Sequence, residues 1–245
     1  MKAFVAKAMK DLGVPGVGFA LIDHGKIVFE GGLGVRNLDK PKRVDAHTLF
    51  MIGSNTKGMS TLMLARLVDE GKLDWDEPVV KAYPSFRLCD PELTEKVLIR
   101  HLVCACTGLP RKDLIWILGT KPDTRPSDIF EQLASSKPTT GLGETFQYSN
   151  LMAAAGGYVG GAVAEPAKDL GVAYDTAMQS LVFDQLGMSE TTFDMARAQS
   201  GNFASPHDTD LDDVVRRVSI ATEYQLEPIS KLLQQDAEGC KLHET

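Results

Sequence analysis

The sequence predicts an α+β fold, in which an antiparallel hairpin is followed by a long run of helices. Residues 16–22 and 26–31 are β-rich and flank the short turn Asp23-His24-Gly25, a pattern typical of a hairpin. From about residue 55 onward the pattern is mostly helical. The chain lacks the strand–helix alternation of a doubly wound parallel sheet, so we expect an antiparallel sheet with packed helices.

The expected helices are bounded by glycine, proline or small polar residues. They cover residues 59–70, 94–105, 127–135, 150–164 and 174–185. Residues 1–10 predict an amphipathic helix with Phe4, Val5 and Ala8 facing inward. Two strands alone are marginal in water, so the hairpin needs partners. The later strand candidate is residues 214–222, followed by a possible helix over residues 228–235.

Composition excludes several classes of function. The 245 residues carry a net charge of −7 without a basic run, which argues against a nucleic-acid partner. Hydrophobic content of 43% and charged content of 24% are typical of a soluble globular protein, and no stretch has the length of a membrane span. Residues 1–10 lack the apolar stretch of a secretory signal. We therefore expect a cytoplasmic protein, or a periplasmic form already trimmed of its signal.

No metal or other cofactor is expected. The four cysteines in 245 residues do not make a disulfide framework, which fits a reducing compartment. Cys104 and Cys106 lack a second cysteine or histidine pair that would complete a metal site, so we interpret them as structural. The histidines at 24, 47, 101 and 207 show no metal-ligand spacing either.

The stretch Ser54-Asn55-Thr56-Lys57 carries the clearest chemical signal. Near the start of a helix, Ser54 and Lys57 lie one turn apart on the same face. Unpaired N–H groups at a helix start favour an oxyanion beside the serine, and a shielded lysine can accept the proton of the hydroxyl. Roughly one S-x-x-K is expected by chance in a chain of this length. The alternative is a serine N-cap followed by a solvated lysine.

A second constellation is Tyr148-Ser149-Asn150, at a predicted junction between a loop and a helix. A tyrosine there can project its phenol into a cleft, and the asparagine offers both an amide donor and a carbonyl acceptor. The alternative is a buried tyrosine with Asn150 as the N-cap of the next helix.

In this order the motifs resemble the serine β-lactamase and penicillin-recognising group, most of all class C β-lactamases and esterases of the same fold. Residues 50–57 resemble the nucleophile segment of that family. Residues 101–110 (HLVCACTGLP) resemble its "HLLTHTSGLP" segment, with cysteines at two threonine positions. Residues 148–150 match its Y-x-N element, and residues 186–193 (LGMSETTF) resemble its "PLGMSDTTF" run. The likeness covers roughly residues 3–212.

The resemblance implies a β-lactamase/transpeptidase-like fold, with a mainly helical domain beside an α/β domain. We expect three parts. Residues 1–75 contain the hairpin and the nucleophile helix, and residues 76–193 are mainly helical. Residues 194–245 form a return segment with an atypical tail. It also implies that Ser54 attacks a carbonyl carbon, with Lys57 and Tyr148 sharing proton transfer in an order that the sequence leaves open. Asn150 would orient Lys57 and the substrate, and the Ser54 N–H would form half of the oxyanion hole.

One family element is absent from the sequence. A Lys- or His-containing strand motif ending in Gly should follow Tyr148, but residues 193–245 contain no K-T-G, H-T-G or H-x-G. A truncated gene product, a fragment of a longer chain, and a variant whose tail replaces the missing strands would each explain this.

The expected function is that of a serine hydrolase acting on a small ester, amide or β-lactam, with ester hydrolysis favoured over β-lactam hydrolysis. The alternative is a catalytically inert or truncated relative that binds a ligand or partner in the same cleft. If another copy of the chain completes the sheet, we expect a homo-oligomer. Trp75, Trp116 and the methionines are expected in the core, whereas Trp116, Asp123 and Arg125 are also candidates for lining the cleft.

Overall fold

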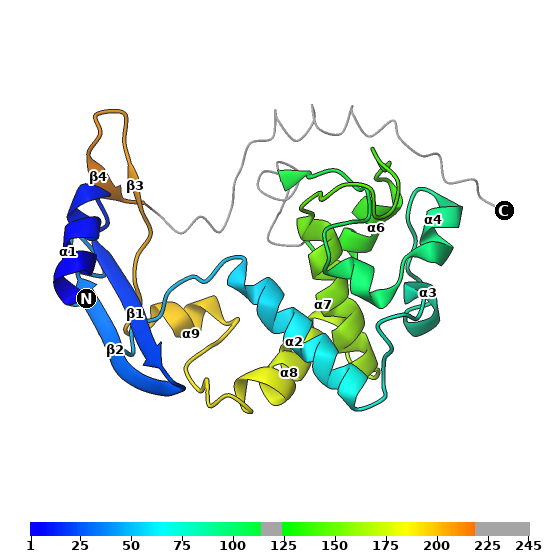
Figure 1. Ribbon diagram of the computed structural model, residues 1–245, viewed down its shortest axis with the longest axis horizontal. Coiled ribbons are helices and arrows are strands. Elements are labelled where there is room, and N and C mark those ends of the chain that lie inside the picture. The colour runs from blue at the N-terminus through cyan, green and yellow to red at the C-terminus, as the bar shows by residue number, and fades with distance from the viewer. Residues whose placement is uncertain (114–123, 219–245) are drawn as a thin grey trace. The chain divides into compact units, whose positions relative to one another are not determined.

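The computed structural model describes residues 1–113 and 124–218 and shows the predicted α+β class. The chain divides into two compact units (Figure 1), described separately below. The hairpin unit comprises residues 1–53 together with residues 189–218 of the return segment, and the helical unit comprises the described part of residues 54–188. The three-part division at residues 75 and 193 stays a prediction.

The hairpin unit contains two small antiparallel sheets. Strands β1 (Gly16–Asp23) and β2 (Lys26–Gly34) pair with a register shift at Leu21 and Ile22, which confirms the predicted hairpin. Strands β3 (His207–Thr209) and β4 (Val215–Arg217) pair with each other. The expectation that the later strand would extend the hairpin is therefore wrong for the described residues, and the helix proposed at residues 228–235 lies outside them.

Two helices complete this unit, α1 (Lys2–Asp11) and α9 (Met195–Gln199). The predicted inward face of α1 is only partly right. Val5 and Ala8 are half-buried, but Phe4 is 76% exposed and α1 has no buried residue. The reason is that this unit offers little interior, since Val44 is its one buried apolar side chain among the described residues.

The helical unit is built around helices α2, α7 and α8. Its elements are α2 (Asn55–Asp69), α3 (Val79–Ala82), α4 (Pro91–Lys96), the 3₁₀ helix η1 (Ile99–Leu102), α6 (Asp128–Ala134), α7 (Asn150–Ala164), α8 (Leu170–Met178) and the π-helical turn η2 (Gln179–Phe183). Three predicted helices are confirmed, α2, α6 and α7. The bounds of α7 are those predicted.

Two predicted helices differ from the structure. The helix expected over residues 94–105 is interrupted at Val97, which is extended. The carbonyl of Val97 accepts from Val79 N at 2.9 Å, and Pro78 bridges to Leu98, so tertiary pairing overrides helix propensity there. The helix expected over residues 174–185 begins earlier, at Leu170, and continues as the π turn before Gly187.

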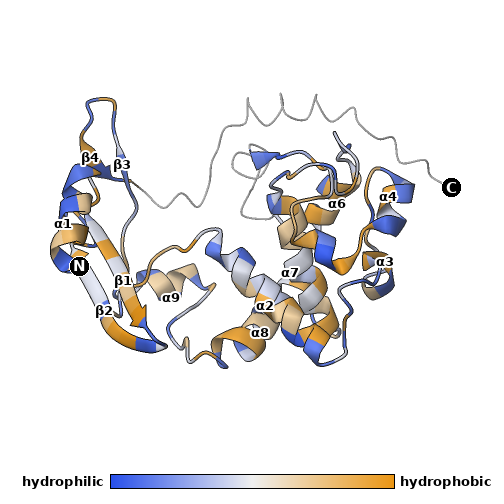
Figure 2. Cartoon of the chain, in the orientation of Figure 1, coloured by the Kyte–Doolittle hydropathy of each residue, from blue (hydrophilic) through white to orange (hydrophobic). Residues whose placement is uncertain are grey.

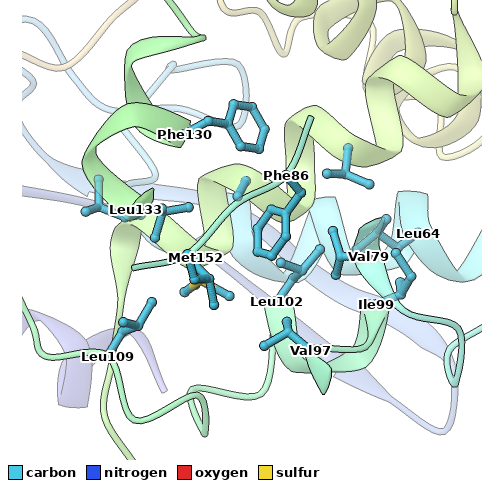
Figure 3. Packing of buried hydrophobic residues seen from close by; sticks show 14 of the residues in the cluster. Leu64, Val79, Phe86, Val97, Ile99, Leu102, Leu109, Phe130, Leu133 and Met152 are labelled. Atoms are coloured by element: carbon cyan, nitrogen blue, oxygen red, sulfur yellow. The ribbon is translucent and has the colours of Figure 1, made fainter. Parts of the chain in front are cut away.

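A large apolar core lies inside the helical unit. Figure 3 shows the Phe86 ring among Val79, Leu102 and Met152, and Phe86 is completely buried. Trp75 packs against this core, as predicted, whereas Trp116 lies outside the described residues. Apolar residues are not confined to this unit, because Figure 2 shows orange stretches along β1 and β2 as well as along α2, α7 and α8.

A disulfide joins Cys104 and Cys106, whose Cα atoms lie 5.4 Å apart. That separation falls in the ordinary range for disulfides. The expectation of cysteines without a disulfide is therefore wrong for this pair. The bond lies in the segment between η1 and the Gly108 turn.

Within residues 1–113 and 124–218, no helix combines the length and apolar character needed to cross a membrane.

Candidate active site

Ser54 directly precedes helix α2, and Lys57 lies one turn along it. The helix begins four residues earlier than predicted, which brings Lys57 inside it. The Ser54 side chain makes no capping hydrogen bond to the helix. Its Oγ instead lies 2.6 Å from Tyr148 Oη and accepts from Lys57 Nζ at 3.2 Å. The alternative of a serine cap followed by a solvated lysine is therefore wrong, since Lys57 is half-buried and bonded.

Tyr148 and Asn150 approach from the start of helix α7. The N-cap of α7 is Ser149, whose Oγ accepts from Met152 N at 3.3 Å. Asn150 is thus the first helical residue and does not act as the cap. Its side chain is turned to the site, where Oδ1 accepts a hydrogen bond from Lys57 Nζ.

The loop before Tyr148 is held by the segment that resembles the family's second motif. Gln147 N donates to Ala105 O, and Thr139 N donates to Gly108 O, each at 2.8 Å. Gly108 has φ +76°, and a Cβ there would lie 2.0 Å from Thr140 O. Only glycine fits this close approach, which explains the Gly in the turn before Leu109 and Pro110.

Packing of α2 against α7 sets the spacing between the two halves of the site. The interface contains Met63 and Leu64 of α2, both completely buried. A Cβ at Gly160 of α7 would lie 2.7 Å from Met63 Cε and 2.9 Å from Leu64 Cδ2. The small residues of α7 therefore let the helices approach closely, and this contact holds Lys57 near Tyr148 and Asn150.

Positive charge surrounds the Tyr148 ring. Lys57 Nζ lies 4.6 Å and Arg111 Cζ lies 5.1 Å from the ring centroid. The interaction with the Lys57 ammonium, then the hydrogen bond with Ser54, lowers the pKa of the Tyr148 phenol, and the charge of Arg111 adds to this effect. The arrangement favours the phenolate, which can accept the proton of the Ser54 hydroxyl.

Two polar residues of the site were missed from the sequence. Asp113 Oδ1 accepts from Asn150 Nδ2 at 2.8 Å, and Asp113 Oδ2 accepts from Arg111 Nε. Their position just after Pro110 is the signal that could have found them, because the Gly108 turn brings this segment to the loop before Tyr148.

Arg125 is the remaining cleft candidate that the structure describes. Arg125 bonds to Asp128 at the start of α6, while Trp116 and Asp123 fall outside the described residues. His101 Nδ1 accepts from Leu98 N at 3.0 Å, and burial lowers the pKa of its imidazole. In the described part of the chain, no three His, Cys, Asp or Glu residues gather as a metal site would require.

Comparison with known proteins places this chain in a family. The family model Beta-lactamase matches residues 1–224. Esterase EstB of Burkholderia gladioli is 29% identical over 237 residues, covering 88% of this chain and 56% of the esterase. Protein flp of Staphylococcus aureus (strain N315) is 27% identical over 138 residues, covering 56% of this chain and 28% of that protein.

Solved structures agree on the fold. The octameric penicillin-binding protein homologue from Pyrococcus abyssi superposes with a TM-score of 0.67 at 22% identity, covering 96% of this chain and 55% of that one. A class C beta lactamase gives a TM-score of 0.64 at 21% identity, covering 89% and 56%. The chain thus spans little more than half the length of the esterase and of these two structures. Because the family model covers most of the sequence, the chain belongs to the Beta-lactamase family and has its β-lactamase/transpeptidase-like α+β fold.

Proposed function

We propose that this protein is a serine hydrolase that acts through an acyl-enzyme on a small ester or amide, as a carboxylesterase or a β-lactamase-like enzyme. The observation that carries the proposal is the position of the Ser54 hydroxyl. Its oxygen lies within hydrogen-bond distance of both Tyr148 Oη and Lys57 Nζ. A hydroxyl placed between two such groups has a route for its proton as it attacks a carbonyl.

The proposed steps follow from these contacts. Ser54 Oγ forms a bond to the carbonyl carbon of the substrate and the carbonyl oxygen becomes an oxyanion, while the serine proton passes to Tyr148 as the phenolate or to Lys57 as the neutral amine. The same groups return a proton to the departing alcohol or amine, which leaves the acyl group on Ser54. Water then attacks the acyl-enzyme, its proton follows the same route, and the carboxylic acid is released.

Asn150 and the start of α2 take supporting roles in the proposal. Asn150 accepts from Lys57 through Oδ1 and orients the lysine and the substrate's ester or amide group. The Ser54 backbone N–H, at the start of α2, serves as one oxyanion donor. Membership of a family that includes Esterase EstB supports an ester as substrate.

The test is ester turnover by the wild type and by Ser54→Ala. We expect a short-chain aryl ester to be hydrolysed by the wild type and Ser54→Ala to fall to the uncatalysed rate, because no other nucleophile is assigned. The control is Ser60→Ala, since Ser60 lies on the same helix but bonds to Tyr174 Oη at 2.8 Å. Equal background rates for the wild type and Ser54→Ala would refute the proposal.

The second candidate function is that of an inert relative that binds a ligand or a partner through the same groups. It is favoured by the absence of the K-T-G or H-x-G motif from residues 193–245, since losing an oxyanion donor costs roughly 10²- to 10³-fold in rate. A homo-oligomer forms if another copy of the chain completes the sheet, and the related penicillin-binding protein homologue from Pyrococcus abyssi is octameric. Light scattering during gel filtration distinguishes a monomer from an assembly.

A further inference from the structure

The carboxylate of Asp113 lies next to the groups to which we assign catalysis, although neither its sequence pattern nor the comparisons assign it a role. It accepts hydrogen bonds on both oxygens, from Asn150 Nδ2 at 2.8 Å and from Arg111 Nε. The Asp113 side chain is only 20% exposed, whereas that of Arg111 is 63% exposed. The Arg111–Asp113 pair thus places a mostly covered negative charge directly behind Asn150.

This contact fixes which way the Asn150 amide faces. A carboxylate can only accept, so the Asn150 NH₂ group must turn toward Asp113 and Oδ1 must turn away from it. In that orientation Oδ1 accepts from Lys57 Nζ. A reversed amide would present its NH₂ to the lysine ammonium and its oxygen to a carboxylate, and both contacts would be unfavourable. Asp113 therefore controls the position of Lys57 through one intervening side chain.

Arg111 links the same carboxylate to Tyr148. Its Nε donates to Asp113, and its guanidinium carbon lies 5.1 Å from the Tyr148 ring centroid. A guanidinium over an aromatic face is attracted to the ring and limits its movement. The pair therefore contacts Asn150, which bonds to Lys57, through Asp113, and Tyr148, which bonds to Ser54, through Arg111.

We propose that the Arg111–Asp113 pair is a positioning unit of the active site, in which Asp113 sets the orientation of the Asn150 amide and thereby holds Lys57 at Ser54, while Arg111 restrains Asp113 and the Tyr148 ring. The inference rests on the proposed function for its effect on rate. Neither residue is assigned a contact with the substrate, so the pair acts through its neighbours.

The kinetic test compares Asp113→Ala, Asp113→Asn and Asp76→Ala. Asp113→Ala removes the acceptor, and we expect kcat for the ester to fall roughly 10- to 100-fold with KM unchanged within about twofold, the size of effect that small misplacements of reacting groups produce. Asp113→Asn keeps one acceptor oxygen but replaces the other with an NH₂ donor, so we expect a kcat between those of the wild type and Asp113→Ala. Asp76→Ala is the matched control, because it breaks an ion pair with Arg100 (2.6 Å) away from the site and should leave kcat unchanged.

A second readout does not depend on turnover. The chain has four asparagines, Asn37, Asn55, Asn150 and Asn202, so a sample labelled with ¹⁵N-asparagine gives four side-chain amide signals. The Asn150 signal is identified by its loss in Asn150→Ala. We expect it to shift in Asp113→Ala well beyond the shifts of Asn37 and Asn202, and to stay in place in Asp76→Ala.

The outcomes separate the two proposals. Suppose that the wild type hydrolyses the ester, that Asp113→Ala and Asp76→Ala have equal kcat, and that the Asn150 signal does not move. This result overturns the positioning unit and leaves the proposed hydrolase activity intact. A wild type without turnover overturns the hydrolase, and the Asn150 signal then decides alone. If the signal moves in Asp113→Ala, the orienting role stands, and if it does not, the role is refuted.

Discussion

The two compact units of the chain bury very different amounts of apolar surface. The helical unit encloses Phe86, Leu64 and Met152 at 2% exposure or less, in a contiguous core. The hairpin unit leaves Ile22 and Ile27 at 65% and 63% exposure on its strands. Each square ångström of apolar surface removed from water contributes roughly 25 cal/mol, so stability is concentrated in the helical unit.

This difference matters because every assigned site residue belongs to the helical unit. Ser54 directly precedes α2 and Lys57 lies in its first turn, while Tyr148 lies just before α7 and Asn150 is its first residue. Their mutual distances depend on the contact between these two helices. The geometry of the proton-transfer groups is therefore maintained by the well-packed interior of the helical unit.

The largest expected effect is a loss of activity without a matching loss of stability. Lys57→Ala should lower kcat/KM for the ester roughly 10²- to 10⁴-fold, the usual contribution of a positioned acid–base group, with little change in unfolding temperature. The control is Lys72→Ala, because Lys72 lies just after the same helix and forms an ion pair with the exposed Glu70. Equal activity of the two variants would contradict the role given to Lys57.

A core truncation measures the contrast between the units directly. Phe86→Ala should lower the free energy of unfolding by about 3–5 kcal/mol, because a completely buried ring leaves a cavity. Ile22→Ala in the hairpin should change it by about 0.5 kcal/mol or less, because the side chain is mostly exposed. Urea unfolding of both variants gives the comparison. Similar losses would mean that the hairpin carries as much stability as the core.

Two glycine substitutions test the helix packing that spaces the site. A Cβ at Gly161 of α7 would lie 2.7 Å from both Cα and N of Tyr174, so α8 must move away in Gly161→Ala. We expect a loss of about 1–3 kcal/mol, the usual cost of overpacking. Gly58→Ala on α2 meets no atom within 4 Å and should gain up to about 1 kcal/mol. Thermal unfolding checks both, and a stable Gly161→Ala would show that the helices are loosely packed.

The smallest expected effect is a pH dependence of rate and stability that follows the ionisation of Tyr148. The pKa of Tyr148 lies below its ordinary value of 10.0 because of Lys57, Ser54 and Arg111. A lowered folded pKa contributes stability in full above the unfolded pKa near 10, and this contribution is lost as pH falls through the lowered folded pKa. Both kcat/KM and the contribution of Tyr148 to stability should therefore rise with pH through an inflection below 10.

The check on this assignment is the pH–rate profile of Tyr148→Phe. That variant should retain its fold, react more slowly and lack the inflection. An unchanged profile would mean that the inflection belongs to another group.

The sequence predicted the helices whose signals are local. Helix α7 matched at both ends because Ser149 caps its start and the small-residue run stops before Pro166. The interruption at Val97 escaped prediction, because it depends on pairing with Val79, which no local pattern encodes. The same holds for the partner of β4, which is β3 and not the hairpin.

The candidate site shows the same limit. Ser54, Lys57, Tyr148 and Asn150 were identified from motifs, and the structure brings all four together. Asp113 was missed because its importance comes from a turn, not from a motif. The Gly108 turn carries it back to Asn150, which lies 37 residues later in the chain.

The most direct test of the central claim is reaction of the folded protein with a fluorophosphonate, followed by peptide mass spectrometry. We predict a single phosphonyl adduct on the peptide that contains Ser54, formed more slowly in Tyr148→Phe and absent in Ser54→Ala. Folded wild-type protein without an adduct, or with an adduct on another residue that persists in Ser54→Ala, would contradict the assignment of Ser54 as the nucleophile.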